Sequence, residues 1–182
     1  MRNKEFAIPK YTTSQEIKEV RKSLKLTQQE FANLLCCSKP TVVRWESNTD
    51  PITGPVVFAI YALMHSDLQN QIIIPEMKYN LRLTYYHRET VCTIIDVDEL
   101  KEKIDIINYN TNTMFQAFGA NKKPTFQDYN EFLASRCFPP TRDKLKTVLA
   151  DLNLPFYDPL MIIEKTAGKM AEDDFWIKVE RK

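Results

Sequence analysis

The segment Leu26–Ser47, "LTQQEFANLLCCSKPTVVRWES", constrains the fold of this chain more strongly than any other. Thr27 stands before a run with helical apolar spacing, and Glu30 follows three residues later. This is the spacing of a capping box, in which each side chain accepts a hydrogen bond from the backbone N–H of the other residue. The pattern therefore predicts a helix that begins at Gln28 and ends near Leu35.

A second short helix follows. Ser38 has the position of an N-cap, and Pro40 falls in the first turn, where a missing N–H group costs little. Val42 and Trp45 stand three residues apart on one face, so we expect both to point inward. This helix runs to about Ser47. A helical apolar pattern precedes both helices, at Ile17, Val20 and Leu24. Two short helices joined by a turn of roughly three residues form a helix-turn-helix.

Two adjacent cysteines, Cys36 and Cys37, occupy that turn. The chain has four cysteines and two histidines, and none of the cysteines forms a C-x-x-C pair, so no zinc-site pattern is present. Neighbouring cysteines do not easily bond to each other. We therefore expect structural thiols, with Cys36 in an unusual backbone conformation and Cys37 filling the space between the helices. We expect no metal and no cofactor.

These residues resemble the helix-turn-helix of the Xre/Cro family of bacterial and phage regulators. The family pattern is Thr-Gln, a helix ending in Leu-Gly, then Val-Ser, and a helix closing with Trp-Glu. This chain matches that pattern in register at Thr27, Gln28, Leu35, Ser38, Trp45 and Glu46. The similarity covers about residues 14–65, and Cys36 stands where the family has its turn glycine. The resemblance implies an all-α DNA-binding domain of a sequence-specific transcriptional regulator.

The second helix of such a motif enters the major groove, where its exposed side chains meet base edges. With Val42 and Trp45 inward, the outward residues are Lys39, Pro40, Thr41, Val43 and Arg44. Arg44 can bind a guanine edge or a phosphate, and Thr41 and Val43 can contact a thymine methyl group. Thr41 fits a capping role equally well, and Val43 fits a packing role equally well.

Two further residues of the motif have separate expected roles. Gln28 begins its helix and is placed to meet a DNA phosphate. Glu46 is expected to tie this segment to the first helix, because a carboxylate repels phosphate.

The charge of the chain neither announces nor excludes nucleic-acid binding. The net charge is +1, and residues 1–70 carry nine Lys or Arg against seven Asp or Glu. A dimer that presents one basic face can bind DNA with a near-neutral total. Because one module contacts only a half-site, we expect a homodimer on an inverted-repeat operator in double-stranded DNA. The apolar segment 54–74 can supply core and part of the dimer interface.

Near residue 75 the apolar residues change from helical spacing to strand-like runs, which predicts two domains, 1–74 and 75–182. The second begins with three strand patterns, "LRLTYYH", "TVCTIIDVD" and "KIDIINY". Helical patterns follow in "TFQDYNEFLASR", "TRDKLKTVLADL" and "DPLMIIEKTAG", and a last strand is plausible in "DFWIKVE". We predict an all-α helix-turn-helix domain and an α+β domain, the latter a three-stranded antiparallel sheet followed by helices.

The second domain also carries a weaker resemblance, through "LASRCFPPTRDKLKTVLADLNLPFYDP" and "EKTAGKMAEDDFWIKVER". These segments are similar to small Firmicutes proteins that are often encoded beside HipA-like kinases. The resemblance implies an antitoxin-like autorepressor whose second domain meets a partner protein, such as a toxin, a kinase-like protein or a defence nuclease, or dimerises. The candidate partner-binding residues are Arg136, Arg142 and Tyr157, whereas Phe138 and Trp176 fit better as anchors of the fold.

An alternative function is open at this point. A protein of a mobile element can inhibit a host or defence protein through such a second domain, as anti-CRISPR proteins of this layout do, while its helix-turn-helix represses its own gene.

Enzymatic signals are weak, so we expect no enzyme. The carboxylates Asp96, Asp98, Glu99 and Glu102 lack the glycine of a calcium loop, and Cys137 lacks an evident base. No phosphate-binding glycine loop occurs. The chain has neither an apolar run that could span a membrane nor a signal-peptide pattern at its start, and we expect a cytoplasmic protein.

Overall fold

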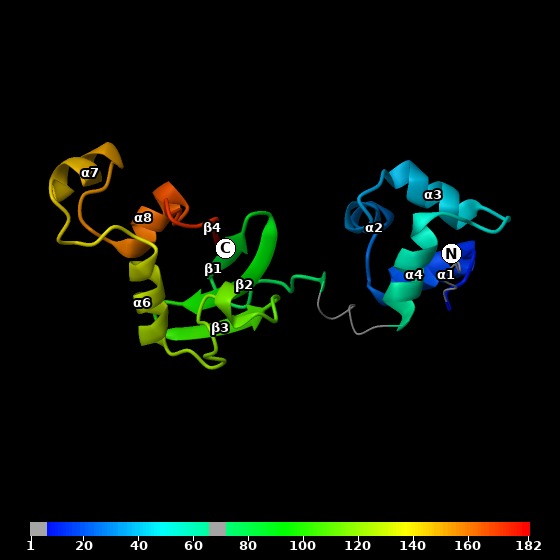
Figure 1. Cartoon of the computed structure of the whole chain (residues 1–182), viewed down its shortest axis with the longest axis horizontal. Coiled ribbons are helices and arrows are strands. Elements are labelled where there is room, and N and C mark those ends of the chain that lie inside the picture. Colours follow the sequence, from blue (N-terminus) through cyan, green and yellow to red (C-terminus); the bar gives the residue numbers. More distant parts are fainter. Residues whose placement is uncertain (1–6, 66–71) are drawn as a thin grey trace, which may run out of the picture. The chain divides into compact units, whose positions relative to one another are not determined.

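The structure, a computed structural model, describes residues 7–65 and 72–182. The chain divides into two units, residues 1–74 and 75–182, and each is described by itself. The first unit contains only helices, whereas the second combines a sheet with helices (Figure 1).

Four helices build the described part of the first unit. They are α1 (Ser14–Ser23), α2 (Gln28–Leu34), α3 (Lys39–Ser47) and α4 (Pro55–His65). Their apolar faces meet in one core, in which Ile17, Phe31 and Val42 have no exposed surface. Capping boxes begin α1 at Thr13 and α2 at Thr27, so the predicted start of α2 is confirmed.

The second unit contains a four-stranded antiparallel sheet in the order β3-β2-β1-β4. Its strands are β1 (Leu81–His87), β2 (Thr90–Asp98), β3 (Lys103–Asn108) and β4 (Phe175–Arg181). The prediction of three strands was therefore one strand short. The additional strand is β4, which was expected as a last strand but not as part of this sheet. It pairs with β1 over its whole length and places Ile177 in the core opposite Tyr85.

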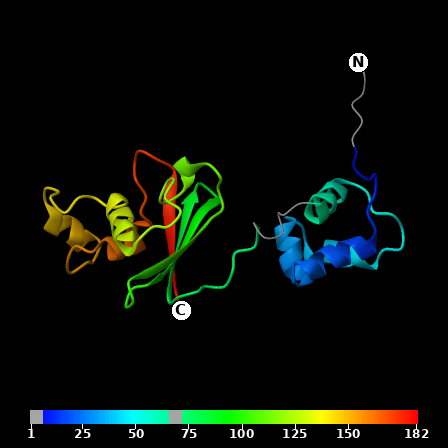
Figure 2. The ribbon, with the colours of Figure 1, turned by 90° about the horizontal axis from the view of Figure 1, so that it is seen from below.

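Helices lie on one side of this sheet, and α7 is the farthest from the strands (Figure 2). They are α6 (Phe126–Ser135), α7 (Leu145–Asp151) and α8 (Pro159–Thr166), and the short 3-10 helix η1 (Thr113–Phe115) precedes them in the chain. Thr125 and Asp128 form a capping box at the start of α6, and Asp158 caps α8. After α8, Ala167 and Gly168 both take the left-handed conformation, with φ of 55° and 59°, so the chain turns back into β4.

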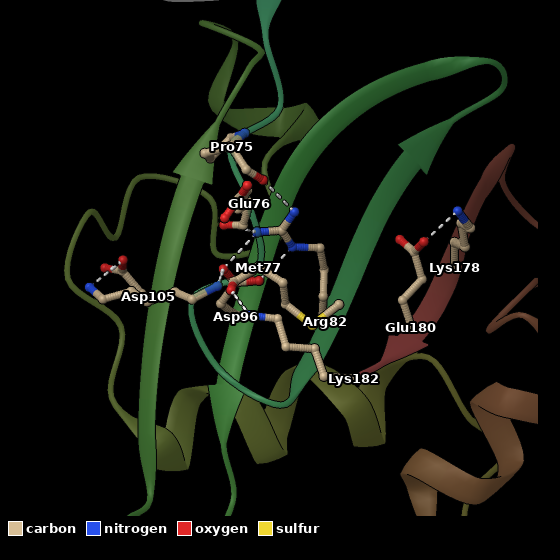
Figure 3. A network of polar contacts seen from close by, with 10 residues as sticks. Pro75, Glu76, Met77, Arg82, Asp96, Asp105, Lys178, Glu180 and Lys182 are labelled. Carbon is tan, nitrogen blue, oxygen red and sulfur yellow. Dashed lines mark hydrogen bonds and ion pairs between the residues drawn. The ribbon is translucent and has the colours of Figure 1, made fainter.

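The opposite face of the sheet carries a network of polar contacts around Arg82 on β1 and Asp96 on β2 (Figure 3). The guanidinium of Arg82 donates to both carboxylate oxygens of Asp96, at 2.6 and 2.7 Å. It also donates to the carbonyls of Pro75 and Glu76, at 2.8 and 3.1 Å. Lys78 adds its backbone N–H to Asp96 at 2.8 Å. The first residues of the second unit are thus fastened to its sheet.

Among the helices that the structure describes, none is long and apolar enough to cross a membrane.

Candidate nucleic-acid interface

The turn between α2 and α3 shows why adjacent cysteines fit there. Cys36 has a φ of 51°, the left-handed conformation that favours glycine. The N–H of Cys36 donates to the carbonyl of Asn33 at 3.1 Å, and the N–H of Cys37 donates to that of Ala32 at 2.9 Å. This pair of bonds is a Schellman motif, which ends α2 and redirects the chain. Cys37 is half-buried against the helical core.

Both cysteine predictions for the turn are therefore confirmed: Cys36 takes the unusual backbone conformation, and Cys37 fills the space between the helices. Burial raises the pKa of the Cys37 thiol, with the neighbouring Cys36 as a smaller cause, so Cys37 remains protonated near neutral pH.

Helix α3 begins at the predicted place because Ser38 caps it. The Ser38 side chain accepts a hydrogen bond from the N–H of Thr41, and Pro40 lies in the first turn. Val42 is fully buried and Trp45 is half-buried against the core, so the predicted inward face of α3 is confirmed. Docking through this face orients the remaining side chains of the helix outward.

Four of the five predicted α3 contacts with DNA, Lys39, Pro40, Val43 and Arg44, have exposed side chains. Val43 keeps 41% of its surface exposed, unusually much for a valine. Thr41, the fifth, is half-buried. Its hydroxyl lies 2.9 Å from the Ser38 hydroxyl, so the Thr41 side chain takes part in the helix cap. In the described part of the chain the guanidinium of Arg44 has no hydrogen bond and no ion pair. Arg44 is thus a long, positively charged side chain on the outward face, and its guanidinium is not engaged by other described residues.

The carboxylate of Glu46, at the inner side of α3, joins three helices. It accepts two hydrogen bonds from Arg21 of α1, at 2.6 and 3.1 Å, and one from the Gln28 amide of α2, at 2.8 Å. Arg21 also donates to the carbonyl of Leu26 at 2.9 Å. The expectation that Glu46 ties this segment to the first helix is confirmed.

Electrostatics keep this junction ionised. Burial raises the pKa of Glu46, but the hydrogen bonds from Arg21 and Gln28 outweigh it and lower the pKa below its ordinary value. The hydrogen bond to Glu46 in turn raises the pKa of Arg21. Gln28 donates one amide N–H to Glu46, and its expected contact with a DNA phosphate stays a prediction. Spacing along the sequence could not reveal this bond, since it joins residues eighteen positions apart.

The candidate residues of the second unit lie in different surroundings. Arg136 is 7% exposed, and its guanidinium donates to Asp173, at 2.6 and 3.0 Å, and to the carbonyls of Gly168 and Phe175. The prediction that Arg136 belongs to a partner-binding surface does not fit this burial. Arg136 instead holds the segment between α8 and β4 in place, a use for which a buried arginine with several acceptors is well suited.

Arg142 and Tyr157 lie near Phe138. The Arg142 guanidinium sits 5.5 Å from the centre of the Phe138 ring. Tyr157 is half-buried, and its hydroxyl donates to the Phe138 carbonyl at 2.8 Å. Of the three candidates, Arg142 alone is exposed. Nearby in sequence, Phe156 keeps 59% of its surface exposed and was missed, because one aromatic residue in a loop carries no periodic signal.

Other chemistry considered for the second unit finds little support. The carboxylate of Asp96 forms an ion pair with Arg82. In residues 7–65 and 72–182, no three His, Cys, Asp or Glu side chains lie close enough together to hold a metal ion. Burial raises the pKa of the Cys137 thiol to about 11, which disfavours the thiolate that a nucleophile requires.

Comparison with protein families returned one match, to the helix-turn-helix model, over residues 17–65. The matched segment contains α2, the turn and α3, together with most of α1 and all of α4. No curated protein and no solved structure matched the chain.

Proposed function

We propose that the helix-turn-helix at residues 17–65 makes this chain a DNA-binding transcriptional regulator that binds an inverted-repeat operator as a homodimer and represses its own gene. DNA binding and regulation follow from the family match. The outward face of α3 is the observation that carries sequence-specific binding. The dimer, the operator symmetry and the autorepression are the finer proposal, which rests on the fact that one such module contacts only a half-site.

The outward face of α3 supports sequence-specific binding for three reasons. Lys39 and Arg44 supply cations that can meet phosphate or a guanine edge. Val43 exposes a branched apolar side chain where a thymine methyl group can be contacted. The Glu46 junction fixes α3 against α1 and α2, so these groups are presented by a rigid element.

The test is a gel-shift titration of the full chain on DNA from upstream of its own gene, repeated at several salt concentrations. Saturable binding to an inverted repeat, weakening steeply with salt, is expected because each neutralised phosphate releases counterions. A scrambled duplex of the same length and composition is the control. Equal affinity for both duplexes would contradict sequence-specific regulation.

The second unit is proposed to bind a partner protein, as an antitoxin does. Two exposed side chains, Arg142 beside the Phe138 ring and Phe156, support this role, because aromatic and arginine side chains are enriched where proteins meet. Co-expression with the product of the adjacent gene tests it. Substituting Arg142→Glu and Phe156→Asp should abolish co-purification, and Lys146→Glu on α7 should not. If the variant with Arg142→Glu and Phe156→Asp still co-purifies with the partner, these residues do not form the partner-binding site.

A further inference from the structure

The two edges of the sheet in the second unit differ. The N–H of Tyr109 donates to the carbonyl of Cys92 at 2.9 Å, which fixes the alternation of hydrogen bonds between β3 and β2. Odd-numbered residues of β3 therefore direct their backbone groups to β2. Ile104 and Ile106 direct theirs away from the sheet.

At the other edge, the outward backbone groups at the start of β4 have partners. The N–H of Ile177 donates to the carbonyl of Ala167 at 2.7 Å, just past the end of α8. The carbonyl of Phe175 accepts a hydrogen bond from Arg136 at 3.1 Å. Loop and side chain thus cover the first part of this edge, which is how proteins commonly protect an edge strand.

In the part of the chain that the structure describes, the outer edge of β3 receives no hydrogen bond of this kind. Within residues 7–65 and 72–182, no backbone or side-chain group bonds to the outward N–H and C=O of Ile104 or Ile106. The flanking side chains of Lys103 and Asp105 are exposed. Asp105 is held through one oxygen by Lys78 at 2.7 Å (Figure 3). Its other oxygen has no partner in the described residues.

We propose that two copies of this chain pair through the free edge of β3, as antiparallel strands related by a two-fold axis. In the register that places Ile104 opposite Ile104 of the second copy, Lys103 stands opposite Asp105, and Asp105 opposite Lys103. Each contact occurs twice by symmetry, and cross-strand pairs of opposite charge stabilise such a ladder. The inference rests on the proposed homodimer and assigns its interface.

Charge also selects this register over its neighbour. The next register that keeps Ile104 and Ile106 facing the second copy places Asp105 opposite Asp105, and like charges directly opposite are destabilising. Lys103 and Asp105 therefore complement each other in the register centred on Ile104.

The experiment measures the mass of the full chain without DNA, by light scattering over a range of concentrations. Lys103→Asp alone and Asp105→Lys alone should each weaken the dimer about tenfold or more, because both symmetry-related pairs become repulsive. The double variant, Lys103→Asp with Asp105→Lys, should restore the dimer. Lys146→Asp, a charge reversal on α7, is the matched control and should leave the mass unchanged.

Folding is monitored by circular dichroism, with Asp105→Asn as a milder second variant. A monomeric wild-type chain, unchanged dimers in both single variants, or failure of the double variant to recover would overturn the assigned interface. Operator binding is measured on the same samples. If the β3 variants remain dimers and still bind the operator, the proposed function stands and the interface assigned to β3 is wrong.

Discussion

The Nε atom of Arg21 lies 2.6 Å from Oε1 of Glu46, and this ion pair joins the first helix to the end of the helix that would read DNA. The Glu46 side chain is only 4% exposed. Removing its charge would leave Arg21 in a half-buried site with no counter-charge. We therefore expect Glu46→Gln to destabilise the first unit by about 1.5–3 kcal/mol at pH 7.

The effect of Glu46→Gln should depend on pH. The pKa of Glu46 is lowered by folding, so its carboxylate contributes stability above its unfolded pKa of about 4.3. That contribution is lost as the pH falls through the folded pKa. Urea unfolding in a Trp176→Phe background, followed by Trp45 fluorescence, should show the difference in stability between wild type and variant narrowing as the pH falls below about 4.3. A difference that stays constant down to the lowest pH at which both fold would disprove the assigned charge.

Arg44→Ala should weaken operator binding without changing stability. The guanidinium is exposed and has no internal partner in the described residues, so its loss removes a contact with DNA and nothing else. We expect a loss of about 1–3 kcal/mol in discrimination at one base position. Binding to operators with single base changes measures it. Arg142→Ala removes the same charge from the second unit and is the control. Full affinity and selectivity in Arg44→Ala would remove this residue from the interface.

Cys36→Gly should stabilise the first unit by about 1 kcal/mol, since glycine adopts a φ of 51° without the Cβ clash that any other residue suffers. Cys36→Ala keeps the Cβ and should show no gain. Thermal unfolding compares the two variants, and operator affinity should be equal in both. A loss of DNA binding in both variants, with the fold intact, would show that the thiol itself has a role.

The pair of Arg82 and Asp96 should behave as one unit. Both side chains are 7% exposed, so either Arg82→Met or Asp96→Leu leaves an unpaired buried charge and should cost about 3–5 kcal/mol. The double variant should cost much less than the sum of the two. In a Trp45→Phe background, Trp176 fluorescence during urea unfolding reports the second unit alone. Additive losses would show that the two side chains do not interact.

Local rules predicted most of the elements. The bounds of β1 and β2 followed from runs rich in β-branched and aromatic residues, and the starts of α2 and α3 followed from caps at Thr27 and Ser38. Each signal lies within a few residues of the element it defines.

Long-range partners could not be predicted in the same way. The pairing of β4 with β1 joins Phe175 to His87, and the burial of Arg136 depends on Asp173, thirty-seven positions away. The engagement of Gln28 by Glu46 is of the same kind. None of these contacts produces a periodic pattern in the sequence, because each joins residues that are brought together only by the tertiary fold of their unit.

The cover over β4 sets a limit on assembly. A sheet with two bare edges can add strands at both ends, and head-to-tail addition then grows into an open filament. Here Ala167 and Arg136 occupy the first part of the edge at β4, which restricts strand addition there. The proposed pairing through β3 would use the β3 edge of both molecules at once. Such an assembly would end at two copies, the number that the proposed inverted-repeat operator requires.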